Sequence, residues 1–242
     1  MNTSEYTQMA KQEDLYWWHL GRKKIIDQRL KNIRLDKKTK ILNIGCGTGG
    51  TIATLEKYGQ LTNVDTSKEA IRHLKKRGIK NVTQVEGLVL PYKNNSFDIV
   101  IALDVLEHIE NDSKALKEWY RVLKPEGKLL ITVPAYQWLW SEHDESLHHY
   151  RRYTASGLHN LVNQNNYKVF KRSYIIVFSF PLIVLYRLIA SIGKNPSQKK
   201  TSYVMLPSAI NTLFVNLLAI EGRLLKYINF PYGTSVLIEA QK

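Results

Sequence analysis

The chain has 242 residues, of which 44% are hydrophobic, enough for one sizeable α/β domain with its own core. Its one cysteine, Cys46, excludes a disulfide framework and a zinc cluster built from several thiolates. The formal net charge of +14 favours an anionic partner, either nucleic acid or an acidic membrane. Residues 1–20 contain no apolar signal-peptide core, and we therefore expect a cytoplasmic protein.

The opening segment, residues 1–36, is predicted to form a helical cap with an aromatic centre at residues 15–30. One interpretation is a helix that packs its aromatic side chains onto the domain. The other is a lid, in which Trp18 or His19 covers a bound ligand and Arg22 faces an anionic group.

Short apolar runs alternate with amphipathic segments in residues 37–135. The predicted strands are residues 40–45, 60–65, 82–87, 97–103 and 127–134. The predicted helices are residues 67–78 and 111–127, and Pro125 and Gly127 end the second of them. Strands and helices that alternate in this way indicate an α/β fold, with a parallel sheet and helices on both of its faces.

Residues 136–242 begin with a long loop and become more apolar toward the end. A predicted helix at 157–167 and a strand at 168–177 precede an apolar helical stretch at 178–192. A basic linker at 193–202, with Lys194, Lys199 and Lys200, leads to an amphipathic helix at 207–228 and a last strand at 233–242. The chain is therefore predicted as one domain, residues 1–242, with a mostly parallel sheet of seven strands and an apolar helical insertion before the last strand.

Glycine stands at positions 45, 47 and 49, where the first predicted strand turns toward a helix. Without side chains there, backbone amides and the helix N-terminus meet a polar ligand directly. Asp65 ends the next strand, and a carboxylate at that place suits the two hydroxyls of a ribose. Alternatively, Asp65 caps the following helix, although Thr66 or Ser67 would serve as well.

The motifs "ILNIGCGTGG", "VD", "VEGLVLPYKNNSFDIVIALDVLEHIEND" and "RVLKPEGKLLITVP", in this order and spacing, resemble the class I S-adenosylmethionine-dependent methyltransferases. They cover roughly residues 40–135, and the last strand, "GTSVLIEAQK", is similar too. The resemblance implies a Rossmann-like, doubly wound sheet and S-adenosylmethionine as the cofactor.

The resemblance also implies a role for each matching residue. The glycine loop would pass under the methionine and ribose, Asp65 would hold the ribose hydroxyls, and Glu86 would meet the adenine amino group. Leu103 and His108 would flank the methionine end. The implied cofactor-binding residues are Gly45, Cys46, Gly47, Gly49, Asp65, Thr66, Glu86, Gly87, Leu88, Leu103 and His108. Asn43 replaces the acidic residue that the family has there, but its amide still offers an acceptor to the methionine ammonium.

The methyl acceptor is expected near the loop after the fifth strand, because loops at the carboxyl ends of strands surround the ligand crevice of such a sheet. If the acceptor is a hydroxyl, His143 or His149 is the candidate base, and Arg151 suits a phosphate or carboxylate on the substrate. The candidate substrate-binding residues are Trp18, Arg22, Tyr136, Trp140, Arg152 and Tyr153. Alternatively, arginine–aspartate pairs hold this long loop in shape.

Two groups of side chains contain potential metal ligands. One is Glu107, His108, Glu110 and Asp112, and the other is His143, Asp144 and His149. The spacing of the first group is poor for a metal site and is typical of the start of a solvated helix. We therefore expect no metal.

Three uses of the apolar tail remain open: a cap over a pocket for an apolar substrate, a contact between two copies of the chain, or helices that lie in an anionic membrane surface. The preferred function is methyl transfer to a small-molecule or lipid-linked acceptor, O-methylation ahead of N- or C-methylation, in the cytoplasm or at the inner face of the membrane. The net charge suggests an RNA methyltransferase as an alternative. The sequence contains neither an "NPPY"-like motif nor a basic patch interleaved with aromatic residues, which are the features that would favour nucleic acid. A non-catalytic cofactor-binding scaffold is the third class, which the intact loop, Asp65 and Glu86 disfavour.

Overall fold

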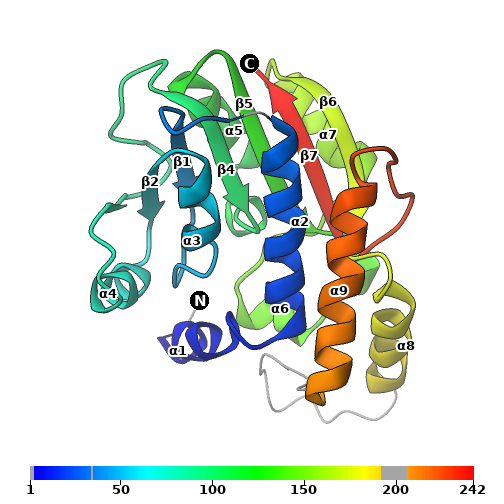
Figure 1. Ribbon diagram of the computed structural model, residues 1–242. Coiled ribbons are helices and arrows are strands. Elements are labelled where there is room, and N and C mark those ends of the chain that lie inside the picture. Colours follow the sequence, from blue (N-terminus) through cyan, green and yellow to red (C-terminus); the bar gives the residue numbers. More distant parts are fainter. Residues whose placement is uncertain (1–2, 34, 192–205) are drawn as a thin grey trace.

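A sheet of seven strands forms the centre of the structure, a computed structural model that describes residues 3–33, 35–191 and 206–242 (Figure 1). The strand order is β3-β2-β1-β4-β5-β7-β6, and β7 runs antiparallel to both of its neighbours while the other pairs are parallel. The strands are β1 (Lys40–Ile44), β2 (Gln60–Asp65), β3 (Val82–Gln84), β4 (Phe97–Leu103), β5 (Leu123–Pro134), β6 (Lys168–Ile175) and β7 (Ser235–Gln241). The predicted mostly parallel α/β sheet is confirmed.

Helices cover both faces of the sheet, with α2, α3 and α9 on one face and α5 and α7 on the other (Figure 1). The helices are α1 (Thr3–Gln12), α2 (Trp17–Ile33), α3 (Ile52–Leu55), α4 (Lys68–Lys76), α5 (Asp112–Val122), α6 (Glu142–Ser146), α7 (Ala155–Gln164), α8 (Phe180–Ser191) and α9 (Ser208–Leu224). Short 3₁₀ helices lie at Glu56–Tyr58, Leu106–His108 and Gln137–Leu139.

The central strands are buried on both faces, which is why they appear in the sequence as continuous apolar runs. In β1, Ile41 packs into the core on one face while Leu42 and Ile44 pack on the other. Two predicted boundaries differ from the structure. The third strand ends at Gln84, and the fifth begins at Leu123 because Leu123 already pairs with Phe97 of β4.

Side-chain caps fix where the helices begin. The Ser67 hydroxyl accepts a hydrogen bond from the Ala70 amide at the start of α4, and Asn111 accepts one from the Lys114 amide at the start of α5. The predicted helix at 111–127 is shorter in the structure and ends at Val122, where the chain turns directly into β5 ahead of Pro125.

The predicted apolar insertion is present as α8 and α9, which lie between β6 and β7 in the chain. Helix α9 packs along α2, and Gly21 allows the close approach: a side chain there would come within 2.2 Å of Leu218 Cδ1. The predicted linker, residues 193–202, lies outside the described residues. None of the described helices is long and apolar enough to cross a membrane.

A buried ion pair joins the cap to the last strand. Arg29 of α2 binds both carboxylate oxygens of Glu239 in β7, at 2.6 and 2.8 Å, and donates a third bond to the Leu225 carbonyl at 3.1 Å. Both side chains are almost completely buried. A pair of this geometry fixes α2, the end of α9 and β7 relative to one another.

Arg29→Met is therefore expected to lower the free energy of unfolding by about 3–5 kcal/mol, because it leaves the Glu239 charge buried without its partner. Arg29→Met combined with Glu239→Leu should lose much less, since no charge is stranded. Arg72→Ala, which removes an exposed pair with Glu69, serves as the control and should cost at most about 1 kcal/mol. Urea denaturation measures all three, and equal losses for Arg29→Met and Arg72→Ala would contradict the assignment.

Candidate functional site

The loop between β1 and α3 contains the three predicted glycines in left-handed conformations, with Gly45 at φ +66°. The Gly45 amide donates to the Val64 carbonyl of β2 at 2.9 Å. A side chain at Gly45 would come within 2.5 Å of Val105 Cγ2, in the segment that follows β4. Glycine is therefore required there, and the loop lies against the end of β4.

Asp65, at the end of β2, is bound to this loop. One of its carboxylate oxygens accepts the Gly47 amide at 2.8 Å, and the other accepts the Ser67 amide at 2.9 Å. Burial raises the pKa of Asp65, and these two amide bonds oppose the shift. Because Ser67 caps α4, Asp65 is not the helix cap, and each of its oxygens retains acceptor capacity for a ligand.

The predicted adenine-binding residues follow the neighbouring strand. The Val85 amide donates to the Asp65 carbonyl at 3.0 Å, so Glu86, Gly87 and Leu88 come directly after a residue bonded to Asp65. Glu86 and Gly87 are exposed, as is Thr66. The glycine loop, Asp65 and residues 86–88 fit a nucleoside-bearing cofactor that extends toward the buried Leu103 at the end of β4.

Two residues of the loop region serve the fold. The Asn43 amide nitrogen donates to Asn63 Oδ1 at 2.9 Å, and Asn63 donates to the Asn81 carbonyl at 2.9 Å, in a buried amide chain across the strands. Asn43 is thus bonded within the sheet, a role that the sequence did not suggest. Burial raises the pKa of the Cys46 thiol strongly, so Cys46 stays protonated and is a loop residue without nucleophilic character.

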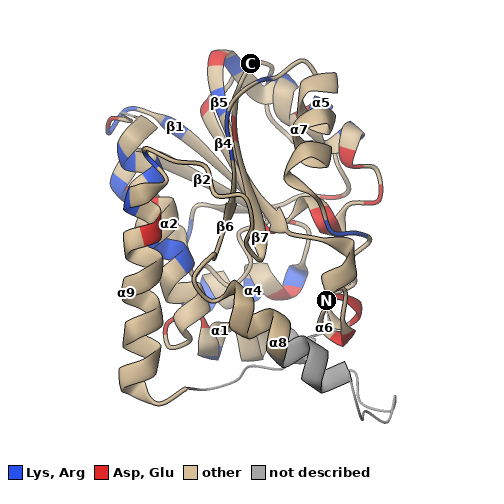
Figure 2. Ribbon diagram, turned by 90° about the vertical axis from the view of Figure 1, so that its right-hand side faces the viewer, with Lys and Arg blue, Asp and Glu red and all other residues tan. Residues whose placement is uncertain are grey.

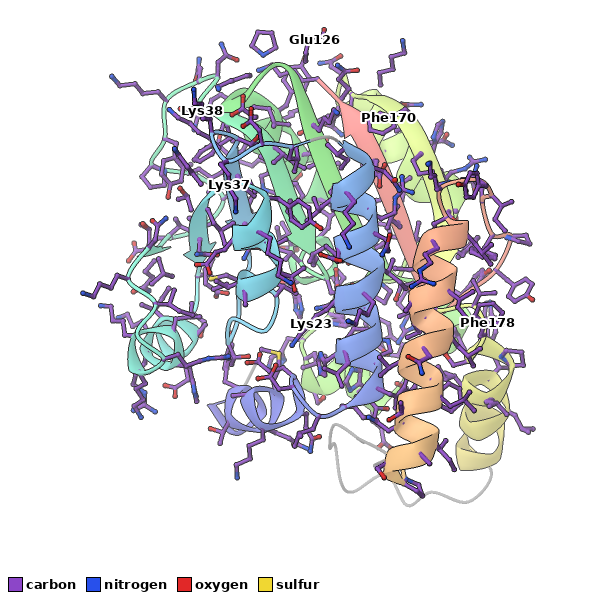
Figure 3. All side chains as sticks on the ribbon, in the orientation of Figure 1. Lys23, Lys37, Lys38, Glu126, Phe170 and Phe178 are labelled. Atoms are coloured by element: carbon purple, nitrogen blue, oxygen red, sulfur yellow. The ribbon has the colours of Figure 1, made fainter. Side chains whose placement is uncertain are left out.

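Helix α1 is the part of the cap that lies next to the glycine loop. Met9 Cε is 3.0 Å from the position of a side chain on Gly47. The buried Glu13 accepts a hydrogen bond from the Thr48 hydroxyl at 2.6 Å and pairs with Arg77. Lys23 of α2 holds the same corner by donating to the Glu13 carbonyl at 2.8 Å (Figure 3). Sequence reasoning missed this contact because residues 3–14 are polar and carry no motif.

Trp18, His19 and Arg22 pack differently from the predicted lid. His19 is buried, and burial lowers its pKa to about 3. Arg22 lies 4.7 Å above the Trp18 ring and pairs with Asp104, which also accepts the Thr132 hydroxyl at 3.1 Å. The anionic group opposite Arg22 is therefore a carboxylate of the chain itself, directly after β4.

The loop after β5 folds back on the segment that follows β4, and its arginines hold it there. Arg152 binds both oxygens of the buried Asp144, at 2.7 and 2.9 Å, and Arg151 binds Asp112 at 2.9 Å. Tyr153 is buried, and its hydroxyl lies 3.1 Å from the Asp112 carboxylate. These contacts match the interpretation in which arginine–aspartate pairs shape the loop.

Tyr136, predicted to line the substrate, packs among other aromatic side chains. Tyr136 stacks on Tyr174 of β6, with ring centroids 4.9 Å apart, and also contacts Trp138 and Phe180. Trp140 is half-buried. Their roles toward a substrate stay predictions.

His149 is the candidate base that the loop brings to the end of β4. Its Nδ1 lies 2.9 Å from Asp144 Oδ1, and its ring centroid lies 4.5 Å from that of His108. Glu107 completes what we call the Glu107–His108–His149 cluster, in which one ligand atom of each residue lies within 4.8 Å of the others. Burial raises the pKa of Glu107 to about 8, and burial together with His149 lowers the pKa of His108 to about 3. The other candidate base, His143 on α6, is not part of the cluster.

Comparison with known proteins identifies the domain that contains this site. Residues 42–131 match the family model described as a methyltransferase domain. A demethylmenaquinone methyltransferase from Anoxybacillus flavithermus is 35% identical over 111 residues, which are 42% of this chain and 47% of that protein. The chain thus spans about half the length of that relative.

Solved structures share the fold. A chain of the complex between the Haloferax volcanii Trm112 methyltransferase activator and the putative methyltransferase aligns with a TM-score of 0.63 at 14% identity, over 98% of this chain and 94% of that one. The [4+2]-cyclase SpnF aligns with a TM-score of 0.58 at 18% identity, over 89% and 80%. SpnF is named for a different reaction, so the fold alone does not identify an activity. The glycine loop and Asp65 are therefore stronger evidence for cofactor binding than the fold is.

Asp65→Ala is expected to abolish measurable binding of S-adenosylhomocysteine in calorimetry, because it removes the acceptor for the ribose hydroxyls and releases the Gly47 amide. Asp98→Ala is the matched control, since Asp98 lies at the opposite end of β4 and pairs with Lys124. An Asp65→Ala protein that binds the ligand as tightly as Asp98→Ala would exclude the ribose assignment.

Proposed function

We propose that this chain, which belongs to the class I S-adenosylmethionine-dependent methyltransferases by its domain and its fold, transfers a methyl group to a small-molecule or lipid-linked acceptor, with a hydroxyl oxygen favoured. S-adenosylmethionine is the cofactor of this family, and it supplies a methyl group already activated on a sulfonium. The observation that carries the proposal is the glycine loop, bound to Asp65 and packed against Val105, just ahead of the Glu107–His108–His149 cluster in the chain.

The chain's own residues would hold the cofactor on one side of the reacting carbon. Asp65 would accept the ribose hydroxyls, the glycine loop would admit the cofactor close to the backbone, and Glu86 would bind the adenine amino group. Helix α1, tied to Thr48 through Glu13, would shield the site from water. Positioning of this kind is the main contribution that an enzyme makes to displacement at an activated carbon.

The acceptor would bind on the other side, between the end of β4 and the loop after β5. Val105 contacts the glycine loop, and Glu107 of the cluster follows two residues later, so we expect the cluster to lie at the end of the site where the methyl group would arrive. Asp144 fixes the ring of His149 through its Nδ1, which turns Nε2 toward the cluster. We assign His149 to activation of the acceptor, with Asp144 and Arg152 as positioning residues.

An apolar surface at the same end of the molecule supports an acceptor that is linked to a lipid. Strands β2 and β4 point toward the end where α1, α6 and α8 lie (Figure 1). Leu182 and Leu185 of α8 and Leu213 of α9 are each more than half exposed, and α9 carries no charged residue before Glu221 (Figure 2). Phe178, just before α8, is exposed as well (Figure 3). Exposed apolar helices in a basic protein suit contact with an anionic membrane surface.

Incubation with methyl-labelled S-adenosylmethionine and separated metabolite, lipid and RNA fractions of the host cell tests the function. We expect label in the metabolite or lipid fraction, in a product one CH₂ heavier than its precursor. His149→Asn should lower this transfer about 10²-fold or more while leaving S-adenosylhomocysteine affinity unchanged. His159→Asn, at a half-buried site on α7 outside the cluster, should not lower the transfer. Label confined to RNA would overturn the proposed acceptor, and normal transfer by His149→Asn would remove His149 from the site.

Sedimentation with phosphatidylglycerol vesicles tests the apolar surface. The protein is expected to co-sediment at low salt, and Leu182→Asp combined with Leu185→Asp should abolish this because charges oppose burial among acyl chains. Val89→Asp, at an exposed apolar residue in the loop after β3, is the control and should co-sediment normally. A wild-type chain that stays in the supernatant would contradict membrane contact.

A further inference from the structure

Glu107 is unusual because carboxylate side chains are rarely buried. Its side chain is completely inaccessible to solvent, and neither carboxylate oxygen has a hydrogen-bond partner within the described residues. A buried carboxylate without partners is costly, and folded proteins pair such groups with hydrogen bonds or with a cation. Glu107 is therefore either neutralised by a proton or paired with a cation that binds here.

The neighbouring arginines are already neutralised by other acids. Arg22 pairs with Asp104, and Arg152 binds both oxygens of Asp144. These two pairs surround Glu107 without donating a hydrogen bond to it. Two histidine rings lie next to Glu107. One ring nitrogen of His108, one ring nitrogen of His149 and one carboxylate oxygen of Glu107 all lie within 4.8 Å of one another.

His149 is held so that one of its nitrogens is left for a ligand. Its Nδ1 binds Asp144 at 2.9 Å, which leaves Nε2, while the ring of His108 lies close to the backbone of Leu147. Metal-bound histidines in proteins are oriented in this way, by a carboxylate or carbonyl on the nitrogen that does not bind the metal. Asp144 thus has the position of an outer-shell carboxylate.

We propose that Glu107, His108 and His149 bind a divalent transition-metal cation, and that the cation activates the methyl acceptor. Two imidazoles and one carboxylate are the ligands of catalytic zinc and of open non-haem iron sites, and they leave positions for a substrate. Metal–ligand bonds of about 2.0–2.2 Å place ligand atoms about 3–4 Å apart, so a small closure of the three side chains is sufficient. The predicted absence of a metal considered residues 107–112 and the group His143, Asp144 and His149 separately, whereas this site combines Glu107 and His108 with His149 from the loop after β5.

The cation has a direct chemical use, which rests on the proposed function. Coordination lowers the pKa of a bound hydroxyl, as it does for water on zinc. The hydroxyl proton leaves to solvent, and the oxygen uses its electron pair to form the bond to the methyl carbon. The electron pair of the broken carbon–sulfur bond stays on sulfur, which becomes a neutral thioether. His149 would then act on the acceptor through the cation and would not take the proton itself.

Calorimetric titration of the untagged, EDTA-dialysed chain with Zn²⁺ alone tests the site, and Co²⁺ absorption in the visible range reports the ligands. One cation per chain is expected. Glu107→Gln and His149→Asn should each weaken binding by more than the 10–100-fold typical of outer-shell variants. His148→Asn is the matched control, because His148 is the exposed neighbour of His149 and lies outside the cluster; it should bind as the wild type does.

The outcomes separate this inference from the proposed function. S-adenosylhomocysteine affinity should be unchanged in Glu107→Gln, which shows that the variant is folded. A wild-type chain that binds no Zn²⁺ or Co²⁺, or variants that bind like His148→Asn, would overturn the metal site. Methyl transfer that persists undiminished after chelation would also overturn it while leaving the methyltransferase function intact. Specific metal binding without detectable transfer would support the site and count against the function.

Discussion

The hydrogen bond from the Gly47 amide to the Asp65 carboxylate is the interaction on which the rest of the site depends. It ties the loop after β1 to the end of β2, at 2.8 Å, and so fixes the conformation of the glycine loop. The same carboxylate binds the Ser67 amide at the start of α4. Two strands, a loop and a helix are thereby fixed around one buried charge, which retains acceptor capacity for the cofactor.

Two arginine–aspartate ion pairs shape the acceptor side of the site. Arg22 with Asp104 and Arg152 with Asp144 fix the chain after β4 and after β5, and Gly45 lets Val105 approach the cofactor loop. Once these pairs are made, Glu107 is the buried carboxylate that has no hydrogen bond within the described residues. The arginine–aspartate pairs that shape the loop therefore also set the polarity around the Glu107–His108–His149 cluster.

Much of the fold could be predicted because buried strands are continuous apolar runs and because Ser67 and Asn111 mark helix starts. The glycine loop and Asp65 could be located because both follow strands directly. By contrast, Glu107 and His149 meet only because the loop after β5 folds back, with the Tyr150 amide bonded to the Glu107 carbonyl at 2.8 Å. Sequence spacing carries no trace of such a contact. The position of α1 was also hidden, since Glu13 makes its bonds to Thr48 and Arg77 through tertiary structure alone.

A crystal structure of the chain with S-adenosylhomocysteine tests the central claim most directly, because the claim concerns where the reacting sulfur lies. We predict ribose hydroxyls on Asp65, adenine beside Glu86 and Leu88, and the sulfur facing Glu107, His108 and His149. A ligand whose sulfur faces away from these three residues, or one that binds outside the glycine loop, would contradict it.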